Sequence, residues 1–189
     1  MWRGADPERS VGRQVLLGAK IFIPNMIPDA TNHKHFMKEA LKEADKAFRK
    51  GETPIGAVIA HKNKIIARAH NQVEMLKDAT AHAEMIAITQ AASTLGDWRL
   101  TDTTLYVTKE PCFMCSGALV QSRVKHLVFG IADLKTGGAG SAMNIVADSR
   151  TNHRVNVVAG VLADQAKMLL QEFFKVQRLK DKAITVQNN

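Results

Sequence analysis

Two short strand patterns directly follow the first helix pattern of this chain, and helix and strand patterns alternate after them. Apolar residues recur at helical spacing over residues 35–48, and Gly51 ends that predicted helix. Residues 54–60 and 65–69 have the composition of strands, and Lys62-Asn63 between them is a turn sequence. These segments therefore predict a helix followed by a β-hairpin.

The rest of the chain continues with helices and strands in alternation. Strands are predicted at residues 103–107, 126–129 and 155–159, and helices at residues 80–95, 112–121 and 163–180. Thr80 is a candidate N-cap for the first of these helices, and a glycine-rich loop occupies residues 136–140. A hairpin followed by such an alternation is typical of an α/β fold in three αβα layers, with a mixed five-stranded sheet and helices on both faces.

The first 32 residues have no sustained periodicity. We interpret residues 1–32 as an N-terminal extension and residues 33–189 as a single domain with a basic C-terminal helix. Lys20 interrupts the apolar run of the extension, and Asp6 and Glu8 are unusual in an organelle transit peptide, so neither a secretory nor a transit signal is expected. No apolar run reaches the roughly 18 residues of a membrane span. We therefore expect a cytoplasmic protein without a membrane segment.

The chain is strongly basic, with a formal net charge of +8. Residues 1–30 contribute +1, so the remainder of the chain carries +7. A basic surface attracts polyanions, of which nucleic acids are the commonest. Charge alone does not separate a nucleic-acid-binding surface from an ordinary solvated one, and both interpretations stay open at this point.

Only two cysteines are present, Cys112 and Cys115. Two cysteines so close together, with no third to pair with either, exclude a disulfide framework. A reducing compartment is consistent with this pattern, and it leaves the pair free for metal or redox chemistry.

Two short segments carry residues suited to a metal-dependent reaction, and each begins a predicted helix. Cys112 and Cys115 share a face in a first helical turn, where the positive end of the helix dipole stabilises thiolates. His82 completes three N and S ligands, the number typical of a catalytic zinc whose fourth position holds water. We therefore predict one Zn²⁺ per chain on His82, Cys112 and Cys115.

Glu84 supplies the acid–base group that a zinc-activated water needs. A carboxylate beside the metal can take a proton from the water and pass protons to the substrate. Residues two apart on a regular helix point about 200° apart, so His82 and Glu84 can face one centre only if His82 lies in the turn that enters the helix. The sequence therefore predicts a metal at the mouth of this helix.

Other uses of these residues are weaker. A thioredoxin-like redox pair is disfavoured, because the cysteines follow Glu-Pro and no aromatic-Gly-Pro segment is present. Residues 136–140 lack a following Gly-Lys-Ser/Thr, so no nucleotide cofactor is expected. A closed structural zinc site stays open as an alternative, and it would need a fourth ligand from among His33, His35, His61, His70, His126 and His153.

The combined pattern His-x-Glu and Pro-Cys-x-x-Cys is the signature of zinc-dependent nucleobase deaminases. Over residues 35–180 the chain resembles the bacterial tRNA-specific adenosine deaminases of the cytidine deaminase superfamily. The segments at His82 and Cys112 are shared by the whole superfamily. The stretches more particular to the tRNA branch are Val128-Phe129-Gly130, Asp133, Lys135-Thr136-Gly137, Ala139-Gly140-Ser141, Asn152-His153-Arg154-Val155 and Phe173-Phe174.

The resemblance implies hydrolytic deamination of adenosine to inosine at the wobble position, the first of the anticodon, in tRNA. It implies a cytidine-deaminase-like fold, a homodimer with one Zn²⁺ per subunit, and Glu84 as proton shuttle. It also implies that Asn71 hydrogen-bonds the flipped base and that the Asp133 loop and the last helix embrace the anticodon loop. The residues that we assign to substrate binding on this basis are Asn71, Ala83, Asp133, Phe174 and Arg178.

Two other functions share part of this pattern. A deaminase of a free base or nucleoside, such as cytidine or guanine, would use the same zinc motif but would need no basic terminal helix. A non-catalytic zinc module that binds RNA would have no need for an acid at Glu84. Glu84 and the basic terminal helix therefore favour a deaminase that acts on RNA.

Overall fold

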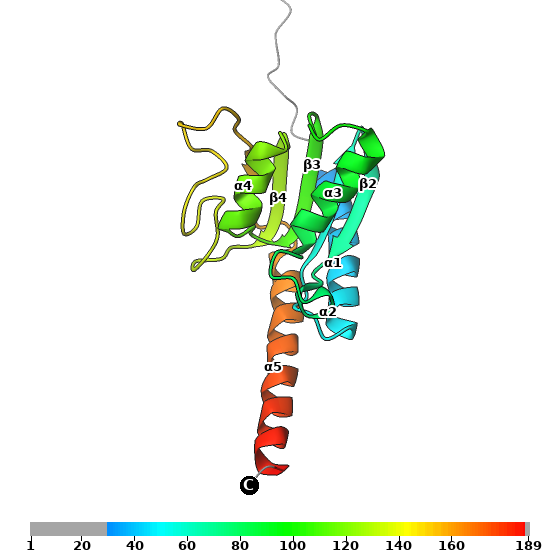
Figure 1. Ribbon diagram of the computed structural model, residues 1–189, viewed down its shortest axis with the longest axis vertical. Helices are drawn as coiled ribbons and strands as arrows, with labels where there is room; N and C mark the ends of the chain where they lie inside the picture. The colour runs from blue at the N-terminus through cyan, green and yellow to red at the C-terminus, as the bar shows by residue number, and fades with distance from the viewer. Residues whose placement is uncertain (1–29, 188–189) are drawn as a thin grey trace, which may run out of the picture.

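The computed structural model describes residues 30–187, which form a five-stranded sheet between two layers of helices (Figure 1). The elements in chain order are α1 (Ala30–Arg49), β1 (Gly56–His61), β2 (Lys64–His70), α2 (Val73–Leu76), α3 (Ala83–Leu95), β3 (Thr103–Lys109), α4 (Phe113–Gln121), β4 (His126–Ile131), β5 (Asn156–Val158) and α5 (Ala163–Gln187).

The sheet has the strand order β2-β1-β3-β4-β5 and is mixed. The hairpin strand β1 pairs antiparallel with both β2 and β3, whereas β3, β4 and β5 run parallel to one another. Parallel neighbours need a crossover connection, and α4 supplies the one between β3 and β4. The predicted mixed five-stranded sheet is confirmed.

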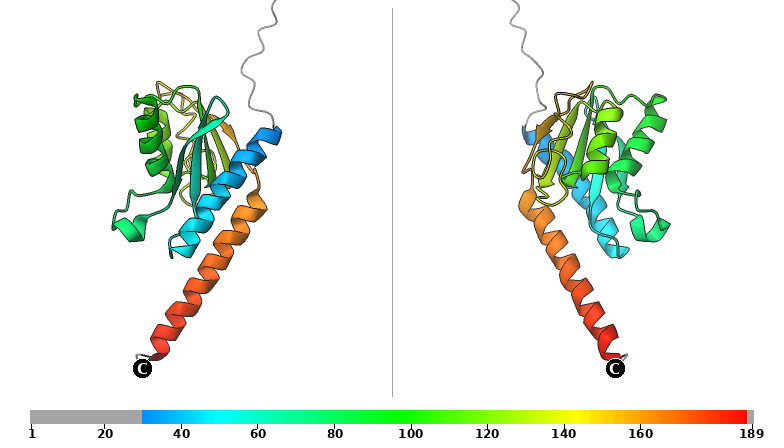
Figure 2. Two further views of the ribbon diagram at one scale, coloured as in Figure 1. Left: turned by 90° about the vertical axis from the view of Figure 1, so that its right-hand side faces the viewer. Right: turned by 60° about the vertical axis from the view of Figure 1, so that its left-hand side comes forward.

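Alternate strand residues face opposite helix layers, as the two-residue period of a strand requires. Val58, Tyr106 and Val128 pack under α1, while Ile59 and Leu105 pack under α3 and α4. Figure 2 shows α1 and α5 together on one side of the sheet and α3 and α4 on the other. The predicted three-layer arrangement is therefore confirmed.

Close contact between α1 and β1 depends on Gly56. A Cβ atom at this position would lie 2.1 Å from the carbonyl oxygen of Ala40 and 2.3 Å from the backbone nitrogen of Ala44. Both alanines are fully buried, so small side chains on the helix and no side chain on the strand bring the two backbones together. This packing fixes the sheet against α1.

Two helix starts differ from the predictions. Helix α1 begins at Ala30, so residues 30–32, which we assigned to the extension, belong to a helix, and the rest of the extension lies outside the described residues. Thr80 is not the N-cap of α3, because the helix begins at Ala83 with His82 at the N-cap. The Thr80 hydroxyl donates to Oδ1 of Asp78 at 2.7 Å instead, within a turn that precedes the helix. The short helix α2 was not predicted.

The C-terminal helix α5 begins against the sheet and then continues well beyond the body of the domain (Figures 1 and 2). Its first turns contact β3, β4 and α1. None of the helices within residues 30–187 combines the length and the apolar character that crossing a membrane requires.

Candidate active site

Two helix N-termini meet at the carboxyl end of β3, and a potential metal ligand stands at each. His82 is the N-cap of α3 and Cys112 is the N-cap of α4, both with extended backbone, as is usual for this position. Neither side chain caps its own helix, so the imidazole and the thiol are available for another role. Cys115 follows in the first turn of α4. His82 therefore lies in the turn that enters its helix, and both cysteines lie at the start of theirs, as the sequence predicts.

The three ligand atoms are close enough to share one metal ion. Nδ1 of His82 lies 3.6 Å from Sγ of Cys112 and 3.5 Å from Sγ of Cys115, and all three atoms lie within 4.8 Å of one another. A tetrahedral zinc, with bonds of about 2.3 Å to sulfur and 2.0–2.1 Å to nitrogen, would separate its S and N ligands by about 3.6 Å. The donor set and its spacing therefore fit zinc.

No other histidine, cysteine or acidic side chain within residues 30–187 joins this cluster. All six remaining histidines lie in that range, so the alternative of a closed site with a second histidine ligand is excluded. Three protein ligands leave one tetrahedral position open, which is the arrangement of catalytic rather than structural zinc sites.

The protein environment favours a thiolate at Cys112. Hydrogen bonds from the Cys115 thiol and from His82 lower the pKa of Cys112 to about 4. The bond with Cys112 and burial raise the pKa of Cys115, and the bond with Cys112 also raises the pKa of His82. Binding of a metal ion would release the protons held by these groups, because metal ligands must be deprotonated.

Glu84 stands in the first turn of α3 and is 4% exposed. Burial raises the pKa of its carboxyl, although hydrogen bonds with its own backbone and with Cys115 oppose the shift. Glu84 is not one of the clustered metal ligands. A carboxyl group beside a cluster of potential metal ligands, with its pKa raised above the usual value, is suited to gain and lose protons.

A pocket of about 270 Å³ opens beside His82, and Asn71 lines it. The other residues that line this pocket are Glu52, Thr53, Ile55, Val73 and Glu74. Nδ2 of Asn71 donates to Oε2 of Glu52 at 3.1 Å, and Oε1 of Glu52 accepts the backbone N–H of Met75 at 2.7 Å. Glu52 thus holds the amide group of Asn71. Among the described residues, none donates a hydrogen bond to Oδ1 of Asn71.

Comparison with known proteins decides the family. The model of the MafB19-like deaminases matches residues 31–178. The tRNA-specific adenosine deaminase of Bacillus subtilis (strain 168) is 51% identical over 153 residues, which cover 81% of this chain and 95% of that protein. The chain belongs to the tRNA-specific adenosine deaminases. The predicted resemblance to this family is confirmed.

Solved structures agree with membership of this family. A structure from studies of A-to-I editing by tRNA:A34 deaminases at the wobble position of transfer RNA superimposes with a TM-score of 0.70 and 38% identity, covering 72% of this chain and 99% of that one. Guanine deaminase from Bacillus subtilis superimposes with a TM-score of 0.53 and 38% identity, covering 58% and 70%. The cytidine-deaminase-like fold is thereby confirmed.

The predicted substrate residues Ala83 and Asp133 lie near the cluster, and neither presents a free side chain. Ala83 is fully buried at the start of α3, so only its backbone can face a ligand. Asp133 is 9% exposed, and its carboxylate accepts bonds from Lys109 and from Thr136 at 2.6 Å each. Burial alone would raise the pKa of Asp133, but these bonds outweigh it and hold the pKa well below its usual range.

The other two predicted contacts lie on α5. Phe174 is 47% exposed and lines a groove of about 880 Å³ together with Arg178. Phe173 is 6% exposed and packs edge-on against Phe48, with ring centroids 5.8 Å apart. Phe173 is therefore the core residue of the aromatic pair, and Phe174 is the one that a ligand could reach.

Two buried acids have structural roles that the sequence analysis did not predict. Glu52 orients Asn71, and Glu110 accepts the backbone N–H groups of Asp133, Ala139 and Ser141 at 2.8–3.1 Å. Gly137 forms an isolated bridge with the metal-ligand candidate at position 112, so this loop is tied to the cluster. Glu110 directly precedes Pro111-Cys112, and this position beside the cysteine motif is the sequence signal that could have indicated its role.

Proposed function

We propose that this chain deaminates adenosine to inosine hydrolytically at the wobble position of tRNA. The observation that carries the proposal is the meeting of His82 and Asn71 in one pocket, with buried Glu84 beside the cysteine cluster. A pocket of about 270 Å³ is slightly below the usual size of small-molecule sites, and it suits a single base turned out of a loop. The names of the relatives indicate that the nucleic acid is tRNA.

The residues that would hold one zinc ion per chain are His82, Cys112 and Cys115. Their donor types and the 3.5–3.6 Å spacing between nitrogen and sulfur support this metal. When bound, zinc supplies a Lewis acid that makes water a competent nucleophile near neutral pH.

Glu84 is proposed to move the protons. Hydrolysis adds one water to C6 of adenine and releases ammonia. The oxygen of the water becomes the C6 carbonyl oxygen, so both of its protons must leave it, one to ring nitrogen N1 and the other to the departing amine. A single carboxyl can perform these transfers in sequence if its pKa is close to neutral, and burial of Glu84 shifts the pKa in that direction. Its position in the first turn of α3 keeps it against the cluster.

Asn71 and the start of α3 are proposed to hold the base. Glu52 fixes the Nδ2 group of Asn71, which leaves Oδ1 to accept a hydrogen bond from an amino or N–H group of the purine. The first backbone N–H groups of a helix have no partner within the helix, so Ala83 can donate to a purine nitrogen through its backbone. These contacts hold C6 of the base near the cluster.

The surface for the rest of the RNA is proposed to be α5. Phe174 offers an exposed ring for base stacking, and Arg178 offers a charge for phosphates in the same groove. With this substrate we propose a cytoplasmic location. We also propose a homodimer, as the resemblance implies.

The test is an in vitro comparison of substrates with the zinc-loaded protein. An anticodon stem-loop with adenosine at the first anticodon position is compared with the same stem-loop carrying guanosine there, and with free adenosine, cytidine and guanine. Inosine in the first stem-loop, with negligible turnover of the free compounds, is the expected result. Rapid deamination of free guanine without inosine in the stem-loop would instead establish a free-base deaminase, the activity of one structural neighbour.

A further inference from the structure

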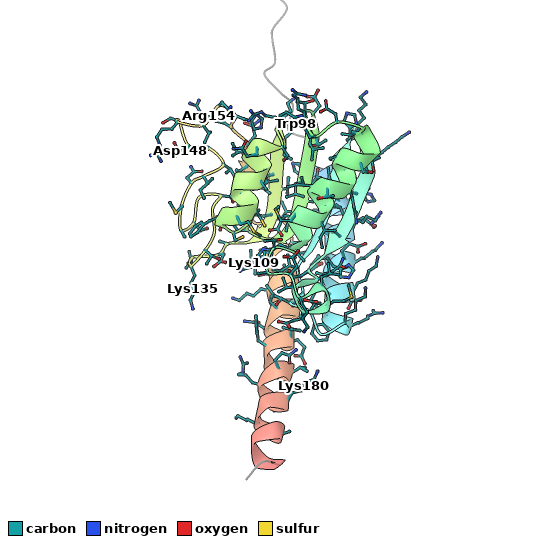
Figure 3. All side chains as sticks on the ribbon, viewed as in Figure 1. Trp98, Lys109, Lys135, Asp148, Arg154 and Lys180 are labelled. Atoms are coloured by element: carbon teal, nitrogen blue, oxygen red, sulfur yellow. The ribbon has the colours of Figure 1, made fainter. Side chains whose placement is uncertain are left out.

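Lys109 is a cation beside the candidate active site that the proposed reaction leaves unused. It is the last residue of β3, three positions before Cys112. Its side chain is 30% exposed, and its charge is near enough to act electrostatically on His82. Figure 3 shows Lys109 on the side of the domain from which α5 projects, towards the proposed RNA surface.

The ammonium of Lys109 lies 2.6 Å from Oδ2 of Asp133. The remaining contacts of that carboxylate are the Thr136 hydroxyl and the backbone N–H groups of Lys135 and Thr136. These three donors carry no formal charge, so within residues 30–187 Lys109 is the one bonded partner that neutralises Asp133.

The backbone of Asp133 is held in place independently of Lys109. Its backbone N–H donates to Glu110 at 2.8 Å, and its carbonyl accepts the N–H of Gly137 at 2.9 Å. Gly137 in turn forms the bridge to Cys112. An uncompensated carboxylate held in this position would repel the phosphates of any RNA that approaches the cluster.

We propose that Lys109 is a positioning residue that holds the Asp133 carboxylate and cancels its charge, so that a phosphate-rich RNA loop can approach the active site. This inference rests on the proposed function and adds to it the residue that makes an acidic loop compatible with a polyanionic substrate. Lys109 acts through Asp133 and not on the reacting atoms, so its removal should weaken RNA binding and leave the chemical step unchanged.

The chain contains a matched control pair at the other end of the same two strands. Lys125, directly before β4, lies 2.8 Å from Asp102, directly before β3, and its side chain is 35% exposed. A strand of seven residues separates the two ends by roughly 20 Å, more than twice the distance over which salt screens charges at physiological ionic strength. Removal of Lys125 should therefore not affect RNA at the active site.

The experiment compares Lys109→Met, Lys109→Arg, Asp133→Asn, the double variant Lys109→Met/Asp133→Asn and the control Lys125→Met, all loaded with zinc. KM and kcat are measured on the adenosine stem-loop, and affinity for the same labelled stem-loop is measured separately by fluorescence anisotropy. Thermal unfolding verifies that each variant is folded.

Lys109→Met should raise KM and the dissociation constant of the stem-loop about tenfold, the size expected when the unpaired Asp133 carboxylate faces an RNA phosphate. Its kcat should stay within about twofold of that of the unmodified protein. Lys109→Arg and Lys125→Met should stay near the unmodified values. The double variant should recover affinity relative to Lys109→Met, and it keeps whatever loss Asp133→Asn causes alone, because Asp133 is itself a predicted substrate contact. The restoration in the double variant is decisive, because a merely structural loss would not be reversed by a second substitution.

Affinity within twofold of the unmodified protein for Lys109→Met, or no recovery in the double variant, would overturn the role of Lys109. Failure of the proposed function has a different appearance: the unmodified protein would then make no inosine. The order of the RNA affinities would still decide the role of Lys109 in that case.

Discussion

Glu110 makes a prediction whose size can be worked out from the structure. Glu110 is 2% exposed, and its carboxylate accepts three backbone N–H groups of the 133–141 loop. Gly137 packs so closely that a Cβ atom there would lie 2.4 Å from Cδ of Glu110. Glu110→Ala would leave those three N–H groups without their acceptor and open a small space beneath the loop.

The expected loss of stability for Glu110→Ala is about 3–5 kcal/mol, since each unsatisfied N–H costs about 1–3 kcal/mol and entering water recovers part of it. For a domain of this size the loss lowers Tm by about 6–20 °C. Glu110→Gln keeps one oxygen but turns an amide towards the N–H of Asp133, so we expect a smaller loss of about 1–2 kcal/mol.

Thermal unfolding followed by circular dichroism, at fixed protein and zinc concentrations, measures both losses. The pH dependence adds a second check. Burial raises the pKa of Glu110, but the hydrogen bonds from Ser141 and from the loop outweigh it, and the net pKa is lowered. The ionised Glu110 carboxylate therefore stabilises the folded protein fully above the unfolded pKa of about 4.3. This contribution is lost as the pH falls through the lower pKa of the folded state. A Tm for Glu110→Ala within about 2 °C of the unmodified protein would refute this reasoning.

Three other predictions concern the metal, the acid and the terminal helix. Glu84→Gln should keep its zinc and its fold but lose roughly 10²–10⁴-fold in turnover, and activity within tenfold of the unmodified protein would exclude the role of Glu84. Cys112→Ala should lose most of its zinc by elemental analysis, and stoichiometric metal in that variant would disprove the ligand set. Phe173→Ala should cost about 3–5 kcal/mol of stability because the ring is buried, whereas Phe174→Ala should change stability by less than about 1 kcal/mol and raise KM for the stem-loop. Equal effects on unfolding from the two phenylalanine variants would contradict their assignment to core and surface.

The fold could be predicted well because its signals are local and periodic. The apolar pattern of α5 and the short β-rich runs of β1 and β3 follow directly from residues that face buried layers, since both strands are buried on both faces of the sheet. The start of α3 could not be placed as well, because Thr80 is a good capping residue by type but bonds to Asp78 in the preceding turn. Competition between local side-chain bonds is invisible in a residue pattern.

The cluster of His82, Cys112 and Cys115 was predictable because metal ligands need particular residue types at short spacings. The roles of the buried acids Glu52 and Glu110 could not be predicted, because their partners are distant in sequence. Glu52 bonds Asn71, 19 residues away, and Glu110 bonds Ser141, 31 residues away. Contacts of this kind depend on the tertiary structure, and no periodicity marks them.

The most direct measurement for the proposed function is sequencing of tRNA from cells depleted of this protein. Complementation with the unmodified chain and with Glu84→Gln provides the matched comparison. Inosine at the first anticodon position should disappear on depletion, return with the unmodified chain and stay absent with Glu84→Gln. Unchanged inosine at that position in depleted cells, or full recovery with Glu84→Gln, would contradict the proposed function.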